Sequence, residues 1–455
     1  MCEPEVNRSH TLSPDGGYRE TELGLLPSDW RVVRLGEVIK QRKEFFRVED
    51  NVIYKRPRVQ VRGQGIVLRD FINGASLKIK HQQQCRAGEF LVAEIDAKVG
   101  GFGVVPPELD GAIVSSHYFL FQIGQCLDRD FLSYYIKMPS FQRQVEARGS
   151  TNYASIRPKH VLEYLIPLPP LPEQLEIARV LRAIQRDIDA TQEVIAAARE
   201  LRKSLMHHLF TYGPVPIDRA DQVPLKETEI GPVPEHWQVV RLGTIVSVKT
   251  GPFGSQLKKE ILRTAGFKVY EQENVIAGDL SRGNDFIDDE TYERLNQFRV
   301  EPGDVLLSRV GSFGRVLMVP EGAPPGIIGS RLLRLRIADK VNLYPSYLVV
   351  ALKSESVSHQ FSLLAHGVVM KGLNSSLVTS LFVPIPPLPE QLEIARVLSV
   401  VDRKIEAEEG RKRALEELFR SMLHHLMTGK LRVRPDTAET QPEPSECQGL
   451  AKTSP

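Results

Sequence analysis

The sequence has few cysteines and no long apolar run, which argues against a protein held together by disulfides or zinc and against a membrane-spanning protein. The 455 residues contain four cysteines, at positions 2, 85, 126 and 447, and they fall singly. This spacing suits neither a zinc site nor a disulfide framework, and it is typical of a reducing compartment. No apolar run approaches the roughly 20 residues that a membrane-spanning helix needs. The acidic, polar start also lacks the regions of a signal peptide. We therefore expect a cytoplasmic protein with no membrane partner.

The motifs that bind nucleotides or transfer methyl groups are also missing. There is no Gly-x-x-x-x-Gly-Lys-Ser/Thr loop, no Gly-x-Gly-x-x-Gly after a predicted strand, and no Asn-Pro-Pro-aromatic signature. Asp96 and Lys98 resemble half of a metal-dependent nuclease site, but the equivalent stretch at 307–310 has no acid and no lysine. The histidine pairs at 207–208 and 424–425 point about 100° apart on a helix, so neither pair can chelate one ion. We expect no catalytic residue, no metal and no cofactor bound by this chain.

A tandem repeat organises the chain. Residues 169–181 read PPLPEQLEIARVL, and residues 386–398 are identical, at an offset of 217. Upstream, the pattern Pro-x-x-Trp-x-Val-Val-Arg-Leu-Gly occurs at 27–36 and again at 234–243, and it contains both tryptophans of the chain. Between these anchors the two halves share little. The chain is therefore a duplication in which a variable globular part and a helix each occur twice.

Each repeat opens a long helix with an apolar seam. From Ile177 and from Ile394 the spacing alternates between four and three residues over more than four heptads, and eight of ten seam positions in each copy are apolar. That period is the coiled-coil pattern. Parallel self-pairing would set Arg202 against Arg202 and Lys412 against Lys412, which a mixed pair avoids. This favours one intramolecular coiled coil, and pairing between two copies of the chain is the alternative.

The variable parts, about 31–166 and 238–383, contain short β-like runs with frequent Gly and Pro, each followed by a helix, at about 129–147 and 345–364. We interpret both as α+β domains. The Pro-Pro-Leu-Pro runs then form rigid joints between domain and helix, although such runs also bind aromatic grooves. The predicted organisation is listed in chain order: an N-terminal tail (1–17), a first domain (18–168), a first spacer helix (169–212), a linker (213–224), a second domain (225–385), a second spacer helix (386–431) and a disordered tail (432–455).

Local charge, and not the overall charge of +2, points to nucleic acid. Residues 31–166 hold 21 basic and 14 acidic side chains, a net charge of +7, and residues 238–383 hold 17 and 14, a net charge of +3. Basic clusters neutralise phosphates, and Arg, Asn and Gln read base edges. A solvated basic surface, or a plain surface turn at 251–259, is the alternative. The candidate DNA-contacting residues are Arg42, Lys43, Arg47, Lys55, Arg56 and Arg58 in the first domain, and Phe253, Ser255, Gln256, Lys258 and Lys259 in the second.

These motifs together resemble the specificity (S) subunit of type I restriction–modification enzymes. The resemblance rests on Pro-Pro-Leu-Pro-Glu-Gln at 169–174 and 386–391 and on the tryptophan elements at 27–36 and 234–243. It also rests on a Gly-Asp-x-Leu element at 303–306, from which the first copy, at 88–91, departs with Glu89 in place of Asp. The resemblance covers roughly residues 18–431, and two copies of every element occur in the expected order.

The resemblance implies a division of labour. Each domain is expected to read one half of a bipartite, asymmetric site in double-stranded DNA, and the two helices are expected to pack antiparallel and to dock two modification (M) subunits. S-adenosylmethionine, ATP and Mg²⁺ belong to the M and restriction (R) subunits. A stand-alone nuclease and a coiled-coil scaffold for proteins remain the rival functions. The spacer and docking residues are expected to be Gln174, Ile177, Leu181, Ile184 and Ile188, and Gln391, Ile394, Leu398, Val401 and Ile405.

Overall fold

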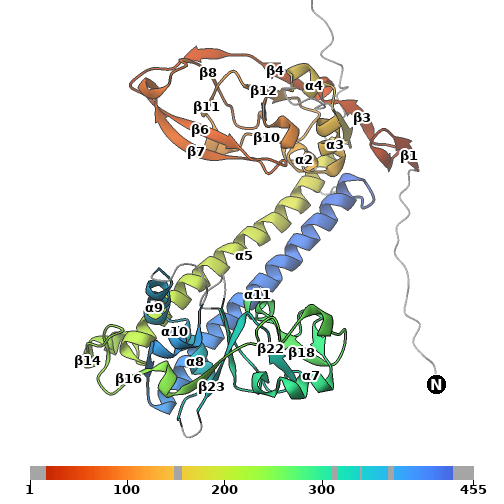
Figure 1. Cartoon of the computed structure of the whole chain (residues 1–455). Helices are drawn as coiled ribbons and strands as arrows, with labels where there is room; N and C mark the ends of the chain where they lie inside the picture. Colours follow the sequence, from red (N-terminus) through yellow and green to blue (C-terminus); the bar gives the residue numbers. More distant parts are fainter. Residues whose placement is uncertain (1–16, 148–155, 310–314, 339–340, 367–372, 434–455) are drawn as a thin grey trace, which may run out of the picture. The chain divides into compact units, whose positions relative to one another are not determined.

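The chain folds into two compact units. The computed structural model describes residues 17–147, 156–309, 315–338, 341–366 and 373–433 (Figure 1). The first unit runs to Thr191 and resumes at Arg411, and the second is Gln192–Gly410. Each unit therefore contains one globular domain and part of both long helices. Most of the two predicted tails lies outside the described residues.

The first unit is built mainly from short antiparallel strands. Its strands are β1 (Tyr18–Thr21), β2 (Gly24–Pro27), β3 (Arg31–Arg34), β4 (Ile39–Arg42), β5 (Phe45–Arg47), β6 (Ile53–Val59), β7 (Ile66–Asn73), β8 (His81–Gln84), β9 (Phe90–Ala93), β10 (Phe102–Val104), β11 (Ile113–Val114), β12 (Tyr118–Ile123) and β13 (Leu165–Leu168). Its short helices are α1 (Leu35–Val38), α2 (Arg129–Tyr135), α3 (Pro139–Ala147) and α4 (Pro158–Leu162). The central sheet has the order β10-β9-β12-β4, and β6 and β7 form a separate two-stranded ribbon (Figure 1).

The second unit repeats this plan with different additions. Its strands are β14 (Leu225–Lys226), β15 (Val233–Pro234), β16 (Gln238–Arg241), β17 (Val246–Thr250), β18 (Phe267–Tyr270), β19 (Phe286–Ile287), β20 (Val305–Ser308), β21 (Val316–Met318), β22 (Gly326–Ile328), β23 (Leu332–Ile337) and β24 (Phe382–Ile385). Its short helices are α6 (Gln272–Ala277), α7 (Asp289–Arg294), α8 (Pro345–Leu352), α9 (Glu355–His366) and α10 (Ser375–Ser380). The central sheet has the order β17-β23-β20-β21, and β19-β18-β22 form a second sheet.

The two central sheets correspond strand for strand. In each, the first strand after the tryptophan element lies at one edge, as β4 or β17, and pairs antiparallel with the long strand β12 or β23. The start and end of each domain also pair, as β3 with β13 and β16 with β24. Because each domain begins and ends on one antiparallel strand pair, the chain passes from each domain into its long helix in the same way.

Two of the β-like runs of the variable parts, at 244–249 and 332–337, indicate strands. The second is confirmed as β23, whereas the first becomes a strand only from Val246, and each helix predicted before the proline cluster is two helices. The break at Lys137 and Met138 precedes Pro139, which fixes its own φ and disfavours helical backbone at the residue before it. The sequence prediction did not separate α2 from α3, because both segments bury apolar side chains.

The long helices are α5 (Leu171–Tyr212) and α11 (Leu388–Met427). Each begins one residue before the proline expected at its start, and a glycine with positive φ, Gly213 or Gly429, follows shortly after each end. Glycine adopts this backbone conformation without the cost that a Cβ atom adds. The first helix therefore ends at its predicted bound, whereas the second ends at Met427, before the predicted bound of 431.

Within each unit the two helices run antiparallel. In the first unit Ile177 and Leu181 of α5 share a buried cluster with Leu426 of α11, and in the second unit Met206 and Leu209 of α5 share one with Ile394 and Leu398. A fully buried Leu or Ile side chain stabilises by about 1.5–3 kcal/mol. Contacts of this kind join the two helices within one chain.

The polar interruption of the seam is also satisfied within the chain. Arg202 of α5 donates to Asp402 of α11, and Arg199 pairs with Glu409 at 2.6 Å. The predicted mixed pairing is thereby confirmed, and so is the α+β fold with two domains and an antiparallel intramolecular helix pair.

Candidate nucleic-acid interface

The tryptophan and the glutamate of the repeat meet in each unit. The Trp30 indole Nε1 donates to Glu173 Oε2 at 3.0 Å, and Trp237 donates to Glu390 Oε2 at 2.8 Å. Both indoles are fully buried, so each N–H needs a partner inside the protein. The glutamate at the helix start thus fixes the domain to its helix.

The other oxygen of this glutamate has a different partner in each unit. Arg432, just after α11, donates to Glu173 Oε1 at 2.6 Å and to both oxygens of Asp29. In the second unit His236 approaches Glu390 Oε1 at 2.7 Å. Side-chain hydrogen bonds from Arg432 hold the pKa of Asp29 below its ordinary value. The end of α11 is therefore tied to the first domain by charge.

The glutamine directly after this glutamate is buried, and its side-chain amide makes three hydrogen bonds in each repeat. Gln174 Nε2 donates to the carbonyl oxygens of Cys126 and Pro169, and its Oε1 accepts from the backbone of Asp128. Gln391 makes the three equivalent bonds, to Asn342, Pro386 and Tyr344. The Pro-Pro-Leu-Pro-Glu-Gln motif is thus a rigid joint between domain and helix, as expected, and Gln174 and Gln391 have no surface to offer a partner.

The apolar residues predicted for spacing and docking lie mainly between the helices. In the first unit these are Ile177, Leu181, Ile184 and Ile188, all buried. In the second unit Ile394 and Leu398 are buried, and Val401 and Ile405 are partly so. Because these side chains are buried or partly buried, they offer little surface to another protein.

The acid of the Gly-Asp-x-Leu element pairs with an arginine in both copies. Asp304 accepts from Arg336 through both oxygens, at 2.8 and 2.7 Å, and from the backbone of Glu301. Glu89 accepts from Arg42 at 2.5 and 2.7 Å and from the backbone of Arg86. The departure from the family pattern therefore keeps the function of the acid, because a longer side chain reaches an arginine on another strand.

Arg42 was predicted to contact DNA, and its place in the structure argues against this. Its side chain is 5% exposed, and it also donates to the Gln84 carbonyl oxygen. The hydrogen bond to Glu89 raises its pKa. A guanidinium held in this way has no free edge for a phosphate or a base, so we remove Arg42 from the candidate set.

The other basic candidates of the first domain are at the surface to different degrees. Lys43, Arg47 and Arg58 are exposed. Lys55 donates to the carbonyl oxygen of Glu108, and Arg56 on the β6–β7 ribbon pairs with Asp70 at 2.7 Å. The exposed basic side chains therefore lie on two segments, Lys43 and Arg47 at and before β5 and Arg58 on the ribbon, where Arg56 is partly neutralised.

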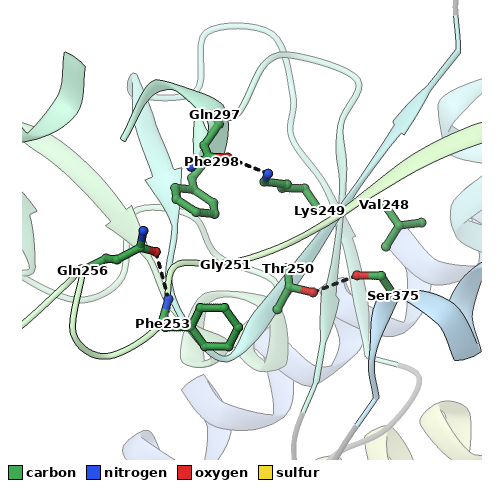
Figure 2. Close-up of a pocket in the computed structure, with 9 residues that line it drawn as sticks. All are labelled: Val248, Lys249, Thr250, Gly251, Phe253, Gln256, Gln297, Phe298 and Ser375. Atoms are coloured by element: carbon green, nitrogen blue, oxygen red, sulfur yellow. Dashed lines mark hydrogen bonds between the residues drawn. The ribbon is translucent and has the colours of Figure 1, made fainter. Parts of the chain in front are cut away.

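The glycine-rich turn of the second domain borders a pocket of about 390 Å³. The turn follows β17, and its Phe253 is 71% exposed. Figure 2 shows the side chains that line the pocket. They are Val248, Lys249, Thr250, Gly251, Phe253, Gln256, Gln297, Phe298 and Ser375. Of the predicted residues, Phe253 and Gln256 line this pocket, whereas Ser255, Lys258 and Lys259 are exposed beside it.

Hydrogen bonds order the side chains around the pocket. Lys249 Nζ donates to Gln297 Oε1 at 2.6 Å, and the Thr250 and Ser375 hydroxyls are 2.8 Å apart (Figure 2). The backbone N–H of Phe253 donates to Gln256 Oε1. Sequence analysis missed Lys249, Thr250, Gln297 and Ser375. Lys249 and Thr250 directly precede the glycine-rich turn, which is a usable indication, but nothing local points to the other two.

The turn needs glycine at its first position. A Cβ atom on Gly251 would lie 1.9 Å from the carbonyl oxygen of Gly329, in the loop between β22 and β23. The two backbone segments therefore approach more closely than any other residue allows. Gly251 itself lines the pocket, two residues before Phe253.

The features weighed for catalysis do not assemble into a site among the described residues. Asp96 precedes a short turn, and the side chain of Lys98 lies outside what the structure describes. His208 Nε2 lies 2.8 Å from the carbonyl oxygen of Val215, at the end of α5. No group of three or more His, Cys, Asp or Glu in the described ranges is placed to hold a metal ion. No described helix is both long and apolar enough to cross a bilayer.

Comparison with known proteins gives one family. The family model described as the type I restriction modification DNA specificity domain matches residues 27–199 and 234–417. The type I restriction enzyme MjaVIII specificity subunit of Methanocaldococcus jannaschii is 26% identical over 429 residues, covering 92% of this chain and 96% of that protein. The putative MjaX specificity subunit of the same organism is 24% identical, covering 92% and 97%.

A solved structure is similar over most of its length. The type I restriction–modification system S subunit from M. genitalium superimposes with a TM-score of 0.57 at 16% identity, covering 87% of this chain and 96% of that one. At this identity the likeness supports the fold alone.

Proposed function

The chain belongs to the family of type I restriction–modification DNA specificity subunits, and we propose that its two domains read the two halves of a bipartite DNA site while its helices dock two modification subunits. DNA recognition is the function of this family. The bipartite target and the two docked subunits are our extension to this chain.

The duplicated joint is the observation that carries the bipartite target. Glu173 and Glu390 fix their domains to the helices through the same contacts with tryptophan, and Gln174 and Gln391 do so through the same backbone groups. The surfaces beyond the joints differ: a basic ribbon in the first domain and a polar pocket in the second. Two unlike surfaces on equivalent attachments favour two different half-sites in one target.

An exposed face that is identical in both repeats supports two equal docking sites. Leu175 and Leu392 occupy the same repeat position and are 50% and 44% exposed. One turn earlier lie the exposed Leu171 and Leu388, and one turn later lie Arg179 and Arg396, each paired with a glutamate three residues before it. Residues at i, i+4 and i+8 share one helix face. Two copies of the same partner could therefore make the same contacts, one copy at each of the two repeats.

Docking is tested by counting bound partners. Leu175→Glu should remove one modification subunit from the purified complex, Leu392→Glu should remove the other, and the double variant should bind none, as measured by native mass spectrometry. Val194→Glu is the matched control, because this valine is 43% exposed on the same helix as Leu175 but lies beyond the repeated face and has Arg411 at the equivalent position. Loss of a partner in this control as well would contradict a specific patch.

Catalysis is assigned to the partner subunits. In this proposal the modification subunits bind S-adenosylmethionine and the restriction subunits bind ATP and Mg²⁺. This chain recognises the DNA sequence and provides the surface on which the subunits assemble. The experiment is methylation of plasmid DNA by the chain with and without the modification subunit. Site-specific methylation only by the complex is expected. Metal-dependent cleavage by the chain alone would favour a nuclease, and partner binding with no preference for any DNA sequence would favour a protein scaffold.

A further inference from the structure

The pocket beside Phe253 offers hydrogen-bond donors and lacks acids. Lys and a backbone N–H donate hydrogen bonds and never accept them. The Oε1 atoms of Gln297 and Gln256 must therefore face Lys249 Nζ and the Phe253 backbone, as the structure has them. The NH2 groups of both glutamines are then left to donate to a ligand, since among the described residues neither has a hydrogen-bond partner. No Asp or Glu is among the described residues that line the pocket.

The orientation of these donors is fixed before any ligand binds. Lys249 is held by Gln297 and also lies 5.3 Å from the centre of the buried Phe298 ring. Gln256 is held by the turn on which Phe253 stands. Groups that are ordered in the free protein lose little entropy on binding, so they discriminate well between ligands.

Apart from the Thr250 and Ser375 hydroxyls, which are bonded to each other, the polar side chains that line the pocket offer donors, and several donors together favour one base in the major groove. Guanine presents two acceptors there, O6 and N7, and no donor. Thymine presents a single acceptor beside a methyl group, cytosine presents a donor, and adenine presents one of each. A phosphate also presents only acceptors. The exposed ring of Phe253 at the same opening favours a base, because an aromatic face contacts a base or a thymine methyl group and adds nothing for a phosphate.

We propose that this pocket reads a guanine in the half-site of the second domain, with Lys249 as the donor to its N7 atom and the amides of Gln297 and Gln256 as donors to its O6 atom. The inference rests on the proposed function and adds to it a base and the side chains that recognise it. Lys258 and Lys259 lie outside the pocket, and we assign them to phosphates.

The test uses the complex with the modification subunits and the bipartite site found by methylation mapping. Exchange of the second domain identifies its half-site, which should contain a guanine. Replacing that guanine by 7-deazaguanine removes N7 and leaves O6, so binding by the unaltered complex should fall about 2- to 12-fold, which corresponds to half of a bidentate contact. Lys249→Met should show the same loss on ordinary DNA and little further loss with 7-deazaguanine. Lys249→Arg should keep the preference, since Arg also bonds to O6 and N7.

Lys258→Met is the matched control, because this lysine is exposed next to the pocket but does not line it. It should leave the base preference unchanged and lower the salt dependence of binding. A uniform loss of affinity in Lys249→Met, with full sensitivity to 7-deazaguanine retained, would assign Lys249 to a phosphate and overturn the inference. A half-site without guanine, or an unchanged preference in Lys249→Met, would also overturn it. Absence of any site-specific methylation by the unaltered complex would instead contradict the proposed function.

Discussion

The buried pair of Arg42 and Glu89 gives the sharpest prediction about the first domain. Both side chains are 5% exposed, and they are joined by two hydrogen bonds of 2.5 and 2.7 Å. Removing one member leaves an uncompensated buried charge, which costs about 3–5 kcal/mol, whereas replacing both by apolar side chains of similar size is close to neutral. Arg42→Met and Glu89→Met should each lower the free energy of unfolding by that amount, and the double variant should recover most of it.

Unfolding of the first unit can be followed separately, because the chain has two tryptophans, one in each unit. In a Trp237→Phe background the fluorescence reports on Trp30 alone. For about 150–250 residues, 1 kcal/mol corresponds to roughly 2–4 °C in Tm, so each single variant should unfold at least about 6 °C lower. If Arg42→Met unfolds normally and its complex loses DNA affinity instead, Arg42 contacts DNA and the reasoning from burial is wrong.

Three further predictions follow from the surface, the turn and the charged joint. Arg58→Met should change the free energy of unfolding by no more than about 0.5 kcal/mol, and the slope of log affinity against log salt for the complex should fall by about one. Gly251→Ala places a Cβ atom 1.9 Å from the Gly329 oxygen, so methylation of the bipartite site should fall about tenfold or more while the Tm of the first unit stays unchanged. The lowered pKa of Asp29 adds stability that is present above the ordinary carboxyl pKa of about 4 and is lost as pH falls through the lowered value. Arg432→Met should therefore remove part of the acid sensitivity of the first unit, measured by unfolding between pH 2 and 5.

Much of the fold was predictable because it depends on repeated segments and on regular apolar spacing along the chain. The identical segments at 169–181 and 386–398 predict two equivalent joints, and the seam from Ile177 and from Ile394 predicts two long helices. The polar seam position Arg202 favoured pairing within the chain, and Asp402 supplies its partner. These predictions depend on residues that are close in sequence or repeated.

The site was less predictable because its residues meet only in the folded chain. Arg42 looks like its exposed neighbour Lys43 in sequence, and only a partner 47 positions away shows that it is buried. In the second domain, Phe253 and Gln256 were found from the glycine-rich turn, but Ser375 joins the pocket from 125 positions beyond Thr250. Charge pattern and turn chemistry therefore predict two candidate surfaces but not the contacts within them.

The central claim is that the two domains read separate halves of one DNA site. Its most direct test is methylation mapping of a host genome after residues 37–166 are replaced by the matching part of a relative. The account predicts a bipartite methylated site in which one half changes and the other half stays the same. A change in both halves, or a site without two separate parts, would contradict it.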